Sequence, residues 1–113
     1  MNNKETTLKS IIQAVIDCCS YDNDDGTQSI TMDMVLGPDR IGDNVNMTRC
    51  ILVRQLNSMG YNNESIARTL GRSESTIRDM LRRGDDFRDT SHAYRLAESE
   101  VKVRIKAIKN DVM

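Results

Sequence analysis

The chain lacks the cysteine and histidine patterns that mark metal centres and disulfide scaffolds. Of its three cysteines, Cys18 and Cys19 are adjacent and Cys50 is alone, so no C-x-x-C spacing occurs. An odd number of cysteines without a secretion signal implies reduced thiols. His92 is the only histidine and has no nearby cysteine, serine or carboxylate pattern that would suggest a proton relay, so we expect it at the surface or at a helix start. We therefore expect no metal, no cofactor and no catalytic site.

Long apolar runs and a glycine-rich phosphate loop are also missing. The most apolar segment near the start is short and has Asp17 near its end, so neither a signal peptide nor a membrane span fits. Without a phosphate loop, nucleotide binding is not expected. These absences predict a cytoplasmic protein that is not an enzyme and has no small-molecule substrate.

An acidic stretch from Asp22 to Gly26 invites comparison with a calcium loop. With Gly26 at the sixth position of an EF-hand, the first ligand would be Tyr21 and the twelfth would be Met32. Neither side chain can supply the carboxylate that the position requires. We therefore interpret the stretch as an exposed acidic turn.

The composition is that of one small folded domain, 1–113. Hydrophobic residues make up 38% and charged residues 29% of the 113 residues, and the single proline leaves long periodic segments uninterrupted. We predict an all-α fold, a small helical domain with a tri-helical helix-turn-helix core flanked by an N-terminal amphipathic helix and a C-terminal helix.

Three segments build the first half of this prediction. Apolar residues at three- and four-residue intervals predict a helix over 6–19, capped near Thr6 or Thr7. The segment 29–37 alternates like a strand, but Thr31 and Gly37 suit the ends of a short helix, and we favour the helix. A loop over 37–46 then leads to Asn46, which we expect to cap a helix over 47–59 that ends at Gly60.

The segment 63–83 predicts two short helices joined at Gly71. Asn62 or Asn63 is expected to cap the first helix and Ser73 the second, and Gly71 is expected to have a positive φ. Small Ala67 suits the helix contact. Two helices this short need a third to dock on, and 47–59 is the candidate. The expected buried side chains are Ile66, Leu70, Ile77 and Met80 or Leu81.

With that side buried, the second helix turns a polar face outward, as a DNA-reading helix does. Arg78 suits guanine, Glu74 suits a cytosine amino group, and Ser75 and Thr76 suit a base edge or a phosphate. Arg72, Arg82 and Arg83 are expected to contact phosphates. The predicted DNA-binding residues are Arg72, Ser73, Glu74, Ser75, Thr76, Arg78, Arg82 and Arg83.

This stretch resembles known DNA-binding families. Ile66-Ala67-Arg68-x-Leu70-Gly71-Arg72-Ser73-x-Ser75-Thr76-Ile77-Arg78 resembles the reading helices of site-specific recombinases, transposases and sigma-factor promoter readers. The order of the predicted elements is more loosely similar to the C-terminal DNA-binding domain of the replication initiator DnaA, whose Gly-Arg-x-x-Thr-Thr-Val element is similar to Gly71–Ile77. The acidic–histidine pair of that family is replaced here by Ser73 and Glu74. The resemblance implies a DnaA-like fold and double-stranded DNA as the partner.

Charge is unevenly distributed along the chain. The net charge is −1 and the isoelectric point is about 5.8, which is not the basic value usual for such modules. From Met47 to Arg83, however, seven arginines face three acidic residues, an excess of four positive charges. The first 46 residues hold three basic and eight acidic residues, an excess of five negative charges. This polarity favours presenting the core to phosphates.

A C-terminal helix is predicted over 88–112, after a polar stretch that begins at Asp85. Its apolar stripe consists of Ala93, Ala97, Val101, Ile105, Ile108 and Val112. The stripe has two interpretations: it packs on the core of its own chain, or it pairs with a second copy to form a homodimer that spans two half-sites.

The leading hypothesis is a small regulator or accessory factor of transcription, replication or recombination that binds duplex DNA sequence-specifically. The alternative is a protein-interaction adaptor that uses the helical fold within a phage-like packaging or replication assembly. Glu74 and Asp79 on the outward face favour the alternative.

Overall fold

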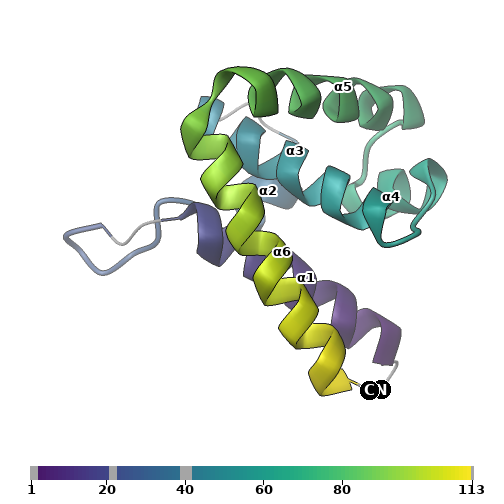
Figure 1. Cartoon of the computed structure of the whole chain (residues 1–113), viewed down its shortest axis with the longest axis horizontal. Helices are drawn as coiled ribbons and strands as arrows, with labels where there is room; N and C mark the ends of the chain where they lie inside the picture. Colours follow the sequence, from purple (N-terminus) through teal and green to yellow (C-terminus); the bar gives the residue numbers. More distant parts are fainter. Residues whose placement is uncertain (1–2, 21–22, 39–41, 113) are drawn as a thin grey trace.

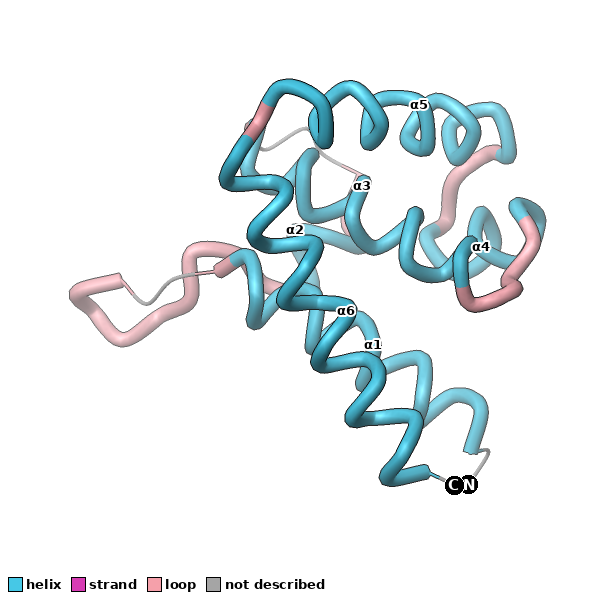
Figure 2. Tube along the Cα trace, in the orientation of Figure 1, coloured by secondary structure: helices cyan, strands magenta, loops and turns pink. Residues whose placement is uncertain are grey.

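The computed structural model describes residues 3–20, 23–38 and 42–112, and within them the fold is all-α (Figures 1 and 2). The helices are α1 (Asn3–Cys19), α2 (Met32–Leu36), α3 (Asp43–Ser58), α4 (Asn63–Leu70), α5 (Glu74–Thr90) and α6 (His92–Val112). Helix α5 lies across α3, with α4 at one end, and α6 leaves the far end of α5 to lie along α1. The beginning of α1 and the end of α6 therefore lie near each other, at the tip of the α1–α6 pair.

One core joins all of these helices. Its centre is α3, whose Ile51, Leu52 and Val53 are at most 1% exposed. Helix α1 adds Ile11 and Val15, and α2, α4, α5 and α6 add further buried side chains, including Val35, Ile66, Leu70, Ile77 and Val101. The predicted all-α class and the role of α3 as the docking partner are confirmed.

The short helix favoured between 29 and 37 is also confirmed. Helix α2 is capped by Thr31, whose hydroxyl accepts a hydrogen bond from the Met34 N–H at 3.3 Å, and it ends at Gly37. Val35 is fully buried. The acidic turn is exposed from Asn23 to Gly26, whereas Asp22 lies outside the described residues, as do 39–41 of the predicted loop.

Two helices begin before their predicted caps. Helix α1 begins at Asn3, not near Thr6 or Thr7, because the polar residues before Leu8 contain no helix breaker. Helix α3 begins at Asp43 and is capped by Gly42, so the prediction of Asn46 as the cap was wrong. The Asn46 N–H already lies inside the helix, because it donates to the Gly42 carbonyl at 3.1 Å. Burial of Val45, 4% exposed, accounts for this extra turn.

The predicted break after Arg83 does not occur. Helix α5 continues through Gly84 and the polar residues to Thr90, and α6 begins at His92 rather than at 88. Gly84 is buried at the α5–α3 contact, where a Cβ would meet the Arg54 side chain and would lie 2.9 Å from the Tyr94 hydroxyl. The glycine therefore permits a close helix approach and does not end the helix.

The apolar stripe of the C-terminal helix packs within its own chain. Val101 is fully buried, Ile105 is 3% exposed, and α6 lies along α1. Ala97 and Ile108 are partly buried, Ala93 is exposed, and the side chain of Val112 lies outside the described residues. This favours the first of the two interpretations of the stripe. His92 is exposed at the start of α6, as expected.

Candidate nucleic-acid interface

The turn between α4 and α5 is built from local interactions that the sequence predicts. Asn62 caps α4 by accepting a hydrogen bond from the Ser65 N–H at 2.8 Å. Gly71 ends that helix in the left-handed conformation, with φ 64° and ψ 38°. Ser73 caps α5 by accepting from the Thr76 N–H at 3.2 Å. These three residues fix the direction in which α5 leaves the turn.

The inner face of this unit is also as predicted. Ile66, Leu70 and Ile77 are at most 2% exposed, and Ala67 is 6% exposed at the helix contact. Met80 and Leu81 are partly buried and pack against the core cluster. These contacts fix the rotation of α5 about its axis, and this rotation determines which of its side chains face solvent.

The outward face begins with Glu74, Ser75 and Arg78, which are all exposed. Arg78 forms no hydrogen bond or ion pair with any residue that the structure describes. Its guanidinium is thus available to a ligand without loss of an internal contact. Ser73 and Thr76 belong to the cap, because their hydroxyl oxygens are 2.9 Å apart, and the Ser75 hydroxyl lies 3.1 Å from that of Ser73.

A phosphate contact would require a free Arg72 guanidinium, but this group is held by the backbone of its own chain. Its guanidinium donates to the Leu70 carbonyl at 2.7 Å and to the Gly37 carbonyl at 2.5 Å. Gly37 also accepts from buried Arg49 at 3.0 Å, so two guanidinium groups bind the C-terminal end of α2. Arg72 therefore joins the turn to α2, and reaching a phosphate would cost both hydrogen bonds.

The Asp79 carboxylate pairs with two arginines that follow it on α5. Its carboxylate is 3.3 Å from Arg82 and 3.1 Å from Arg83. The pairing reduces both the acidity of the outward face and the charge that the two arginines offer to phosphates. The first three turns of α5 keep a net positive charge, with Arg78 as the arginine that has no such partner in the described structure.

The rest of α5 is acidic and limits how far a phosphate backbone could follow the helix. Asp85, Asp86 and Asp89 are exposed there. Arg88 is 3.9 Å from Asp85 and 3.8 Å from Asp89, while the Asp86 carboxylate has no partner among the described residues. An anionic ligand would therefore meet less repulsion at the beginning of α5 than at its end.

The positive charge counted between 47 and 83 is smaller in the folded protein than along the sequence. Arg49 is 3% exposed and binds the carbonyls of α2. Arg54 pairs with Asp85 and with Glu98, its Nε 3.0 Å from the Glu98 carboxylate, and both acidic partners lie beyond residue 83. Arg68 pairs with Glu64 at 3.1 Å, and this acidic residue is already included in the count. The excess of four positive charges is therefore partly consumed by internal contacts.

The polar cluster under the α5–α6 corner was not predicted from the sequence. Glu98, 7% exposed, binds Arg54 of α3, and the Tyr94 ring stacks on Phe87 with centroids 5.6 Å apart. Burial raises the pKa of the Tyr94 hydroxyl above its usual value, so the phenol stays neutral. The burial of Glu98 could have been predicted from its position on the same helix face as Tyr94, Val101 and Ile105.

Comparison of the chain with protein-family models, with curated proteins and with solved structures found no match. Within residues 3–20, 23–38 and 42–112, three or more histidine, cysteine or acidic side chains nowhere come together as a metal site. In the same ranges, no helix has the length and apolar character needed to cross a membrane. The interpretation of this interface therefore depends on its own geometry.

Proposed function

We propose that this chain is a non-enzymatic, sequence-specific DNA-binding protein that places the beginning of α5 in the major groove of duplex DNA. The observation that carries the proposal is Arg78, exposed and unpartnered within the described structure, on the outward face of a capped helix in a helix-turn-helix unit. A guanidinium in this position suits bidentate binding to guanine. The proposed biological role is a regulator or accessory factor of transcription, replication or recombination.

The other residues of the interface take supporting roles in the proposal. Ser75 reaches a base edge or a phosphate, and Glu74 accepts from a cytosine amino group. Arg82 and Arg83 bind phosphates of the DNA backbone after releasing their ion pairs with Asp79. Arg72 acts as a positioning residue, because its two hydrogen bonds hold the turn that sets the direction of α5.

Fluorescence polarisation with random duplex DNA over a salt series tests the proposal. Affinity should fall steeply as salt rises, because bound phosphates release counterions. Arg78→Ala should weaken binding about fivefold to tenfold, equivalent to about 1–1.4 kcal/mol, and should cost about 1–3 kcal/mol at a selected specific site. The matched control is Lys102→Ala, which removes from α6 an exposed cation without a partner among the described residues. Equal effects of the two variants, or no binding at low salt, would reject the assignment of α5.

Replacing Asp79 by asparagine should strengthen DNA binding. The change removes the carboxylate that pairs with Arg82 and Arg83 and frees both guanidinium groups for phosphates. We expect binding about threefold to tenfold tighter at low salt, with a salt dependence steeper by about one unit. Asp86→Asn is the control, because it removes the same charge from α5 without an arginine partner in the described residues. A gain of the same size in both variants would show that Arg82 and Arg83 make no special contribution.

A protein-interaction adaptor is the second candidate function, and the outer face of α6 favours it. Leu96 is 59% exposed and Val103 is 70% exposed, seven residues apart on one helix and opposite the buried Val101. A homodimer through α6 would also have to use this face, because the stripe around Val101 and Ile105 is buried. An adaptor without a basic interface should pass through heparin at moderate salt, whereas the proposed DNA-binding protein should be retained.

A further inference from the structure

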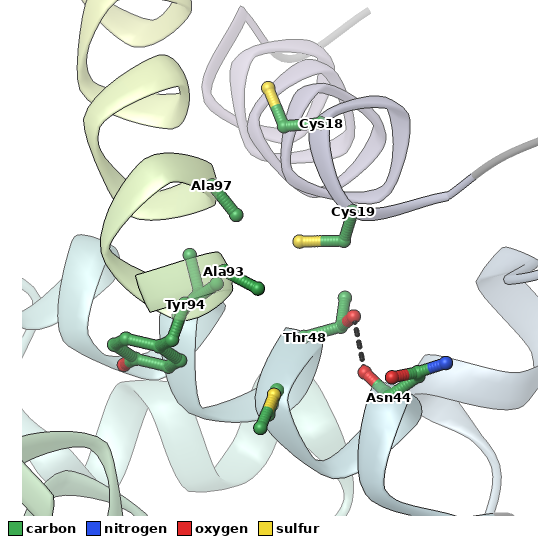
Figure 3. A pocket seen from close by; sticks show the side chains of 9 residues that line it. Cys18, Cys19, Asn44, Thr48, Ala93, Tyr94 and Ala97 are labelled. Carbon is green, nitrogen blue, oxygen red and sulfur yellow. Dashed lines mark hydrogen bonds between the residues drawn. The ribbon is translucent and has the colours of Figure 1, made fainter. Parts of the chain in front are cut away.

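A cavity of about 240 Å³ lies where the end of α1, the beginning of α3 and the beginning of α6 meet. In Figure 3, Cys19 points into this space from α1, and Ala93 and Ala97 face it from successive turns of α6. Met47, Thr48 and Ile51 line it from α3. The space exists because α6 presents two alanines here, where larger side chains would fill the gap between the three helices.

The chemistry of the lining defines what the cavity would accept. No charged side chain is found among its nine described lining residues. The Thr48 hydroxyl already donates to the Asn44 carbonyl at 2.7 Å. Burial raises the pKa of the Cys19 thiol to about 11, so the thiol is protonated near neutral pH and contributes no charge. An ionised ligand would therefore lose hydration without gaining a charged partner among these residues.

Size narrows the ligand class further. An apolar cavity of about 150 Å³ holds benzene, and larger ligand sites begin at about 300 Å³. A cavity between these sizes suits a molecule with one or two fused rings. We propose that the α1–α3–α6 cavity is a binding site for a small, uncharged, mainly aromatic molecule. None of the described lining residues belongs to α5, and the proposal does not depend on DNA binding.

Indole is a suitable probe because it is uncharged and has two fused rings. The experiment records the methionine methyl signals of the full chain, labelled with carbon-13, during titration with indole to its solubility limit. The Met47 methyl signal should shift and saturate, because Met47 lines the cavity, while the Met80 signal under α5 should stay in place. Indole-3-acetate, which is ionised, should bind about tenfold or more weakly.

Filling the cavity provides the decisive control. Ala97→Phe and Ala93→Phe place a ring in the space from two turns of α6, and each should abolish the saturable shift. Ala93 is exposed, so its replacement is the milder test of the two, and far-ultraviolet circular dichroism verifies that the fold persists. Leu96→Phe adds a ring on the outer face of the same helix and should bind indole as the original chain does. A Met47 signal that does not move, or one that moves equally in a folded filled variant, would overturn the proposal.

Discussion

Replacing Arg49 by methionine should lower the free energy of unfolding by about 3 kcal/mol. Arg49 is 3% exposed, and its guanidinium binds three carbonyl oxygens at the C-terminal end of α2. Nε donates to Val35 at 3.0 Å, and Nη2 donates to Met34 at 2.6 Å and to Gly37 at 3.0 Å. Methionine retains much of the apolar stem but leaves the Val35 and Met34 carbonyls without their charged donor, in surroundings that water reaches poorly, while the Gly37 carbonyl keeps Arg72 as its donor.

Urea unfolding followed by circular dichroism measures this effect. A loss of about 3 kcal/mol corresponds to a fall in the thermal midpoint of about 10 °C for a domain of this size. Arg68→Met is the matched control, because the Arg68 side chain is 76% exposed and makes one surface ion pair. That variant should change stability by less than about 0.5 kcal/mol. If both variants lost equally little free energy of unfolding, the end of α2 would not depend on Arg49.

Replacing Gly84 by alanine should destabilise the protein by about 2 kcal/mol, although alanine is the better helix former. Helix propensity alone predicts a gain of about 1 kcal/mol. The added Cβ, however, would overlap the Arg54 side chain and would lie 2.9 Å from the Tyr94 hydroxyl. Arg54 is held there by Asp85 and Glu98, so moving it disturbs a buried ion pair as well as the packing.

Two further variants separate packing from propensity. Asp86→Ala alters an exposed site on the same helix and should leave stability unchanged or slightly higher. In a Tyr94→Phe background, Gly84→Ala should cost about 0.5–1 kcal/mol less, because one of the two crowding groups is gone. A stabilising effect of Gly84→Ala in the original chain would mean that α5 does not approach α3 as closely as the structure shows.

Gly84 and Gly71 illustrate why sequence analysis placed one helix end correctly and missed another. At Gly71, the positive φ and the neighbouring caps are local, so the pattern from Asn62 to Ser73 contains the information needed. At Gly84, the relevant contacts come from Arg54 and Tyr94, and the same residue type lies inside a helix. A glycine in a sequence does not reveal which of these two uses applies.

The arginines illustrate the same difference for the candidate site. The outward position of Arg78 follows from helix periodicity once Ile77 is buried, and the structure places it on that face. The fates of Arg49, Arg54 and Arg72 depend on partners that lie 12 to 44 residues away in the sequence. Counting charges along the chain therefore overstated the positive charge that the folded protein exposes.

The sequence by itself determined the all-α class, the caps and turn between α4 and α5, and which side of α5 is buried. Each of these depends on interactions within about four residues or on the 3.6-residue period. The tertiary structure alone decided that α5 continues past Gly84 and that the α6 stripe packs on α1. It also decided that Arg72 binds Gly37. These outcomes depend on contacts between helices that are distant in sequence, and local periodicity carries no information about such contacts.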